Sequence, residues 1–255
     1  MRLVYIILFF IVGLFMGSFY TVVGSRLPKR EDFVKKRSHC DNCGHNLSFL
    51  DMIPIISYIF LRGKCRYCHE KISPLSTYME LFSGILYALS FFVFGRSYEL
   101  FVALGIVSLL IILSVSDISY YIIPDEILIF FTGYFLIVIT IKSGVMSALY
   151  ALLSGIVLFG FMYIIMLLGN FIFKKESLGG GDIKLMFVIG LVLNPFLGIV
   201  VIFLASFIAL PISLIILWKK RQNLIPFGPF LLIGFTLIYF MQLSMSTIIE
   251  FISFF

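Results

Sequence analysis

The sequence predicts an all-α, polytopic membrane protein with about eight transmembrane helices and one polar cytoplasmic loop between the first two. Hydrophobic residues make up 61% of the chain and charged residues only 13%, with a mean hydropathy of +1.12. These values lie far outside the range of soluble proteins. Apolar runs fill most of the length, so we expect a single membrane-embedded domain over residues 1–255 and no separate soluble domain.

Eight apolar runs follow one another along the chain. They cover residues 3–23, 78–94, 100–116, 122–141, 145–173, 183–193, 196–218 and 230–249. A helix that crosses a bilayer needs about 20 residues, and the first run is long enough. No small-residue cleavage site follows it, so we interpret it as a transmembrane helix and not as a signal peptide.

The polar loop, residues 25–77, is strongly basic. It carries ten lysines and arginines against five acidic residues. By the positive-inside rule the loop lies in the cytoplasm, which puts the N-terminus outside. With eight crossings the C-terminus is also outside, and the basic links near residues 174–175 and 219–221 then fall inside, in agreement with the same rule.

The sixth run, residues 183–193, is too short to cross alone. Eleven residues span only about 16 Å of a hydrocarbon core near 30 Å. One long helix through Pro195 would avoid this problem, but it would move the basic residues 219–221 to the outside. We therefore predict a helical hairpin whose first arm begins below the membrane surface, which would sink Asp182 toward the hydrocarbon.

Two aspartates mark the expected cytoplasmic side, Asp117 at the end of the third run and Asp182 after Gly179-Gly180-Gly181. Consecutive glycines weaken a helix, which indicates a close approach of another segment. Ionisable groups near hydrocarbon are rare unless they are paired or functional. Two carboxyls that share one proton are the chemistry of aspartyl proteolysis. The alternative is that each aspartate only caps a helix.

Four other charged residues lie near apolar runs. Asp125 and Glu126 follow Pro124 in what should be the first turn of a helix, where proline and acidic residues are locally favourable. For Lys184 we expect snorkelling to the cytoplasmic interface. Glu80 could pair with an arginine of the loop or help to hold a methyl-group donor, and the first of these is favoured.

All four cysteines lie in the polar loop as two Cys-x-x-Cys pairs, Cys40 and Cys43, then Cys65 and Cys68. Two such pairs predict a zinc site, because four thiolates complete the tetrahedral coordination of a zinc ion. The bound ion would cross-link a loop that has little hydrophobic core of its own. A saturated shell makes this metal structural and leaves no need for His45 or His69. Disulfides are the alternative, disfavoured in a reducing cytoplasm, and a redox role is less expected.

Several short motifs carry a resemblance over essentially the whole length. They are Gly17-Ser18-Phe19, Arg26-Leu27-Pro28, Ile53-Pro54, Ser57-Tyr58, Leu61-Arg62-Gly63, Ser73, Tyr78, Glu80, Ile123-Pro124-Asp125, Gly179-Gly180-Gly181-Asp182-Ile183-Lys184-Leu185 and Ile225-Pro226-Phe227-Gly228-Pro229-Phe230, together with the four cysteines and Asp117. With these, the chain resembles the bacterial type IV prepilin peptidases, bifunctional leader peptidases and N-methyltransferases among the GxGD aspartyl membrane proteases. It departs at Thr21, where the family usually has asparagine.

The resemblance implies an activity and partners. The substrates would be the basic leaders of type IV prepilins or pseudopilins, cut at the cytoplasmic face of the bacterial cytoplasmic membrane, with Asp117 and Asp182 as the catalytic pair. Methylation of the new N-terminus would use S-adenosylmethionine, for which the sequence indicates no binding residues. Nucleic acid is not an expected partner, and the oligomeric state stays open. The alternative function is a non-catalytic membrane scaffold, or a transporter, with a structural zinc loop.

Overall fold

The structure is a computed structural model that describes residues 1–255 except 34–37, 41, 175–177, 221–224 and 243–255. Within these residues the chain is helical apart from its loops and two isolated bridges. The elements are α1 (Arg2–Arg26), η1 (Leu27–Lys29), η2 (Phe49–Met52), α2 (Ile56–Phe60), α3 (Leu75–Phe94), α4 (Tyr98–Tyr120), α5 (Asp125–Ser143), α6 (Val145–Phe173), α7 (Gly180–Val192), α8 (Pro195–Lys220) and α9 (Gly228–Phe240). The predicted helical class is confirmed.

Six helices in the described part of the chain are long and apolar enough to cross a membrane: α1, α3, α4, α5, α6 and α8. Helices α7 and α9 have 13 residues each, or about 20 Å, which is less than the hydrocarbon thickness. Both pack within the bundle, α7 against α6 and α9 against α4 and α8. A helical membrane protein is therefore established, while the count of eight crossings remains a prediction.

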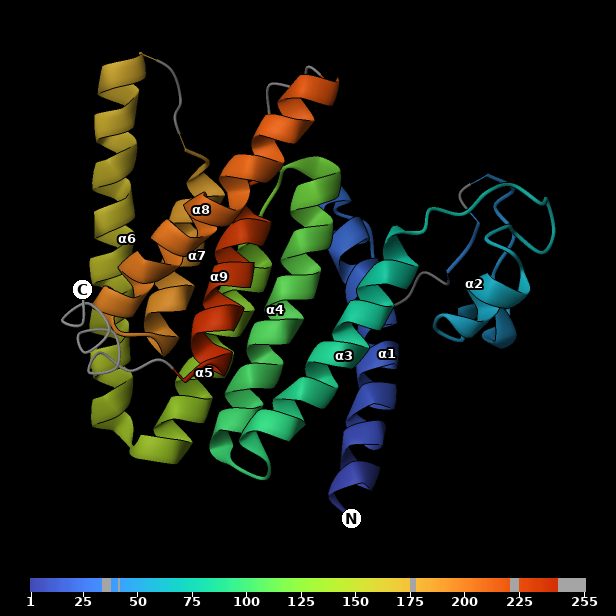
Figure 1. Ribbon diagram of the computed structural model, residues 1–255, viewed down its shortest axis with the longest axis horizontal. Helices are drawn as coiled ribbons and strands as arrows, with labels where there is room; N and C mark the ends of the chain where they lie inside the picture. Colours follow the sequence, from blue (N-terminus) through green and yellow to red (C-terminus); the bar gives the residue numbers. More distant parts are fainter. Residues whose placement is uncertain (34–37, 41, 175–177, 221–224, 243–255) are drawn as a thin grey trace.

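Helix α4 is the centre of the bundle. It contacts α1, α3, α5 and α9, and Ile106, Leu109, Ile111 and Leu113 on it are fully buried. In Figure 1 α1 and α3 lie on one side of α4, while α6, α7 and α8 lie on the other. Asp117 sits in the last turn of α4, so the most buried of the six long apolar helices ends in a carboxylate.

The start of α5 differs from the predicted run 122–141. Tyr121 has a positive φ of 56°, which ends α4, and the hydroxyl of Ser116 donates to the carbonyl of Ile122 over 2.5 Å. The chain then stays extended through Pro124 before α5 begins at Asp125. The residue before a proline disfavours helix, so residues 122–124 form a link and not the first turn.

The predicted hairpin after the glycine run is present. Helix α7 ends at Val192, and α8 begins at Pro195. The side-chain oxygen of Asn194 accepts a hydrogen bond from the backbone of Leu197 over 2.9 Å, which satisfies one of the unpaired amides at the start of α8. The last predicted run, 230–249, starts earlier than expected, at Gly228, and its residues 243–249 lie outside the described part.

The far end of α4 is tied to its neighbours by polar contacts. Glu99, in its first turn, forms an ion pair with Lys142 of α5. The hydroxyl of Tyr239 in α9 lies 2.5 Å from the other carboxylate oxygen of Glu99. These contacts hold α4, α5 and α9 together at the end opposite to Asp117.

Candidate carboxylate site and four-cysteine cluster

Asp117 is buried, with 6% of its surface exposed. Its Oδ2 accepts a hydrogen bond from the backbone N–H of Gly228 over 3.1 Å. Gly228 is the first residue of α9, where the amide groups have no partner inside their own helix. The carboxylate of Asp117 therefore accepts from an amide that would otherwise be unpaired at the start of α9. This is the N-terminal end of the helix, where the helix dipole favours a negative charge.

Asp182 lies in the first turn of α7 and is also buried, with 8% exposed. Gly181, the residue before it, lies against Ile123, and so does Gly228, which holds Asp117. The described residues supply no hydrogen bond to the carboxylate of Asp182. The structure thus brings together two acidic side chains that lie 65 positions apart in the sequence.

Ile123, in the link between α4 and α5, explains how the two helix starts meet. A Cβ atom on Gly181 would lie 2.8 Å from Cβ of Ile123. A Cβ atom on Gly228 would lie 3.1 Å from Cδ1 of Ile123 and 2.8 Å from Oδ2 of Asp117. Only glycine allows both backbones this close. At Gly180, in contrast, a Cβ atom would meet nothing within 4 Å.

The geometry shows how each aspartate sits relative to a helix start. Asp117 does hold a helix start, although the helix is α9 and not one next to it in the sequence. Asp182 is inside α7, whose N-cap is Gly179, so it is not a cap of the expected kind. Capping alone does not require the two carboxyls to converge. Sequence reasoning noted the motif around Gly228 and missed its contact with Asp117.

The two acidic residues after Pro124 are exposed on the surface of the protein. Asp125 forms an ion pair with Lys184, whose Nζ lies 2.7 and 2.8 Å from the two carboxylate oxygens. Both side chains are about half exposed. Glu126 is exposed as well. The ion pair between Lys184 and Asp125 therefore joins α7 to α5 close to the buried Asp117 and Asp182. This ion pair was not expected from the sequence.

The four cysteines come together as predicted. The sulfur atoms of Cys40, Cys43, Cys65 and Cys68 all lie within 4.8 Å of one another, and none forms a disulfide. Cys40 and Cys68 have their sulfurs 3.8 Å apart. Sulfurs around a tetrahedral zinc ion, with bonds of about 2.3 Å, would be about 3.8 Å apart. The residues therefore fit a metal ion of this type.

The same backbone hydrogen bond, from four residues further on, is made to the first cysteine of each pair. The N–H of Gly44 donates to the carbonyl of Cys40 over 2.9 Å, and that of His69 donates to Cys65 over 3.0 Å. Backbone hydrogen bonds from Cys43 and Asn42 lower the pKa of the Cys40 thiol to about 7. The neighbouring thiols in turn raise the pKa of Cys43 to about 11, so without a metal the four sulfurs do not all ionise together near neutral pH.

The histidines are not members of the cluster in the described residues. The ring of His45 instead lies against that of Tyr67, tilted by 35°, with centroids 3.6 Å apart.

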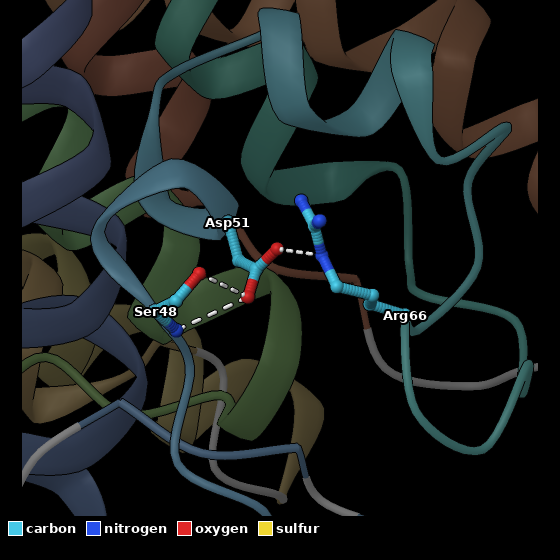
Figure 2. Close-up of polar contacts among 3 residues, drawn as sticks. All are labelled: Ser48, Asp51 and Arg66. Carbon is cyan, nitrogen blue, oxygen red and sulfur yellow. Dashed lines mark hydrogen bonds and ion pairs between the residues drawn. The ribbon is translucent and has the colours of Figure 1, made fainter.

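A second polar group joins the two halves of the loop (Figure 2). Oδ2 of Asp51 accepts hydrogen bonds from the backbone N–H and the hydroxyl of Ser48, over 3.1 and 2.7 Å. Its Oδ1 pairs with Nε of Arg66 over 2.7 Å. Burial alone would raise the pKa of Asp51, but these partners lower it overall. Arg66 lies between Cys65 and Cys68, so this contact positions the second cysteine pair, and sequence reasoning missed it.

Glu80 connects the loop to the bundle. It is buried in α3, and its Oε2 accepts the backbone N–H of Ile55 over 2.9 Å. Its partners are thus a peptide group of the loop and the side chain of Ser18 on α1, not the arginine expected. Ile55 has a φ of 61°, which is unusual for a β-branched residue and needs a specific partner to hold it. Thr21, on α1, is buried and donates to the carbonyl of Ser18 in its own helix.

Together these features define a helical membrane protein with a buried carboxylate pair at one end of the bundle and a cysteine cluster that fits a metal. Residues 11–94 match the family model of the bacterial peptidase A24 N-terminal domain, and residues 104–214 match that of the type IV leader peptidase family. The chain belongs to this peptidase family, as the resemblance of its motifs predicted.

Three similar proteins, all named prepilin leader peptidase/N-methyltransferase, illustrate the relationship. The protein of Bacillus subtilis (strain 168) is 40% identical over 185 residues, which is 72% of each chain. That of Vibrio cholerae is 33% identical over 260 residues, covering 94% of this chain and 98% of the relative. That of Burkholderia pseudomallei (strain 1026b) is 28% identical over 254 residues, covering 88% and 81%. No solved structure matches the chain significantly.

Proposed function

We propose that the protein is a membrane aspartyl endopeptidase that removes the basic N-terminal leader from type IV prepilins or pseudopilins. The observation that carries this proposal is that Asp117 and Asp182 are both buried and lie at the same end of the bundle, on either side of the contacts that Gly228 and Gly181 make with Ile123. Family membership and the names of the relatives support the substrate.

In the proposed mechanism the two carboxyls hold one proton between them. The ionised one takes a proton from a water molecule, whose oxygen attacks the scissile carbonyl carbon, while the protonated one donates to the carbonyl oxygen. Collapse of the tetrahedral intermediate breaks the C–N bond, and the carboxyl that took the proton from water gives it to the leaving amine. The N–H of Gly228 fixes one oxygen of Asp117, which holds this carboxyl in position for the exchange.

We infer a topology of eight crossings from α1, α3, α4, α5, α6, α7, α8 and α9. Residues 25–77 then lie in the cytoplasm, and both termini lie outside the bacterial cytoplasmic membrane. The ends of α4, α7 and α9 that carry Asp117, Asp182 and Gly228 fall on the cytoplasmic side, where a prepilin would present its leader. The charge distribution of the links supports this orientation.

Two further parts of the proposal concern small partners. The four sulfurs would hold a zinc ion with a structural role, because a shell of four protein ligands leaves no open position. The names of the relatives support N-methylation of the new N-terminus, with S-adenosylmethionine as the donor. The residues that would bind this donor are not assigned.

The test is to co-express the full chain with a prepilin and determine the N-terminus of the product by mass spectrometry. We expect a shortened product from the unchanged protein and full-length prepilin with either Asp117→Asn or Asp182→Asn. Glu126→Gln is the matched control, because this acidic residue is exposed near the same site. Cleavage that survives both aspartate substitutions would favour the scaffold or transporter alternative. The same spectrum reports methylation.

A further inference from the structure

The loop carries an apolar surface that nothing in the described chain covers. Six large side chains on and beside η2 and α2 are exposed, and we call them the apolar patch: Phe49, Leu50, Met52, Ile56, Ile59 and Phe60. Phe60 is 83% exposed and Phe49 is 74% exposed. An apolar group of this size on a basic, otherwise polar segment indicates a binding surface.

The attachment of the loop sets the depth of this patch. Helix α3 has 20 residues, or about 30 Å, so it just matches the hydrocarbon core. Glu80 is five residues from its start and so lies at most about 8 Å below the boundary. Its carboxylate holds the N–H of Ile55, and α2 begins at the next residue. The patch is thus tied to the outer layer of the hydrocarbon, not to a point out in the cytosol.

The overall arrangement agrees with this depth. In Figure 1 α2 lies to the side of α3, level with its first turns, and does not extend beyond the end of the bundle. A cytosolic protein could not reach this position without displacing lipid. A segment with its apolar side chains at this level meets the acyl chains directly, as interfacial helices do.

The charges around the patch favour phosphate groups. Arg62, Lys64 and Lys71 line an open hollow of about 510 Å³ next to the end of α2. The acidic Asp51 nearby is already paired with Arg66. Cations beside an apolar surface are attracted to the head groups of anionic lipids.

We propose that residues 49–60 form an interfacial anchor, with the apolar patch inserted into the leaflet nearest the loop and Arg62, Lys64 and Lys71 on the phosphates of anionic lipids. The anchor holds the four-cysteine cluster at the membrane surface. The inference needs only that α3 crosses the bilayer and does not depend on the proposed peptidase activity.

Tryptophan fluorescence tests the anchor. Trp218 is the single tryptophan of the chain, so Trp218→Phe provides a background into which Phe60→Trp or Phe49→Trp is introduced. The full chain is reconstituted in vesicles of phosphatidylcholine and phosphatidylglycerol. We expect lipids brominated on their acyl chains to quench both new tryptophans strongly, and aqueous iodide to quench them weakly.

Tyr67→Trp in the same background is the comparison, because Tyr67 is an exposed aromatic residue of the loop outside the patch. We expect iodide to quench it more strongly than the patch positions. Equal iodide quenching at all three positions would overturn the anchor. Protection from both quenchers that grows with protein-to-lipid ratio would also overturn it, in favour of a second copy as the partner.

Vesicles of phosphatidylcholine alone test the role of the cations. We expect weaker quenching by the brominated lipid at Phe60→Trp in these neutral vesicles. Unchanged quenching would overturn the assignment of Arg62, Lys64 and Lys71 to lipid phosphates.

Discussion

The backbone N–H of Gly228 donates a hydrogen bond to Oδ2 of Asp117, joining residues 111 positions apart across 3.1 Å. This contact ties the end of the central helix α4 to the start of α9. It makes the position of one proposed catalytic carboxyl dependent on a residue that has no side chain.

Gly228→Ala should reduce leader cleavage by at least about tenfold, which corresponds to a rise of about 1.4 kcal/mol in the activation barrier. The added Cβ would lie 2.8 Å from Oδ2 of Asp117, so the carboxyl must move. The cleavage rate of a prepilin in proteoliposomes measures the effect. Gly160→Ala is the control, since its Cβ would meet nothing within 4 Å. Equal activity of the two variants would contradict the positioning role of Gly228.

Within the glycine run, substitution by alanine should be tolerated at Gly180 and not at Gly181. Gly181→Ala would place a Cβ atom 2.8 Å from Ile123, whereas Gly180→Ala enters open space. We expect the first variant to lose about tenfold or more in cleavage rate and the second to stay within about twofold of the unchanged protein. The same proteoliposome assay compares them. If Gly180→Ala were the more damaging, the close approach of α7 to Ile123 would not be the reason for the run.

Asp51 should make the loop sensitive to acid. Its pKa is lowered in the folded loop, so the stability it contributes is present above its ordinary value of 3.8 and is lost as pH falls through the lower folded value. Asp51→Asn should weaken the loop at neutral pH by about 1 kcal/mol and remove this part of the acid dependence. Hydrogen exchange of residues 48–66 in chelator-treated protein measures both effects.

Metal-free protein isolates the effect of Asp51, because acid would also release a metal from thiolates. Ser48→Ala gives a milder comparison that removes one hydrogen bond and keeps the carboxyl. An acid profile of Asp51→Asn identical to that of the unchanged protein would show that other groups govern the transition.

A metal at the four cysteines should stabilise the loop further, beyond the contacts of Asp51. We expect about one zinc ion per purified chain, because four thiolates form one closed tetrahedral shell. Chelation should expose all four thiols to maleimide and increase proteolysis of the loop. Metal analysis, thiol counting and limited proteolysis measure these changes. Thiols that become reactive only after a reductant is added would indicate disulfides and contradict the metal site.

The sequence by itself determined the helical membrane class, the hairpin after the glycine run and the joining of the four cysteines. These features follow from local properties: apolar content and run length, a proline break, and the short spacing of each cysteine pair. The sequence also drew attention to Asp117 and Asp182, since a carboxyl beside an apolar run is costly wherever it lies.

Only the tertiary structure decided what these residues touch. The N–H of Gly228 on Asp117, the contact of Gly181 with Ile123 and the hold of Glu80 on Ile55 are backbone contacts between distant segments. Every residue except proline carries the same backbone N–H group, so the sequence does not show which of these groups will find a distant partner. The sequence also does not show which segment packs against a glycine where the Cβ atom is missing. Such contacts depend on how α3, α4, α7 and α9 are placed in the bundle, and no local pattern in the chain specifies that placement.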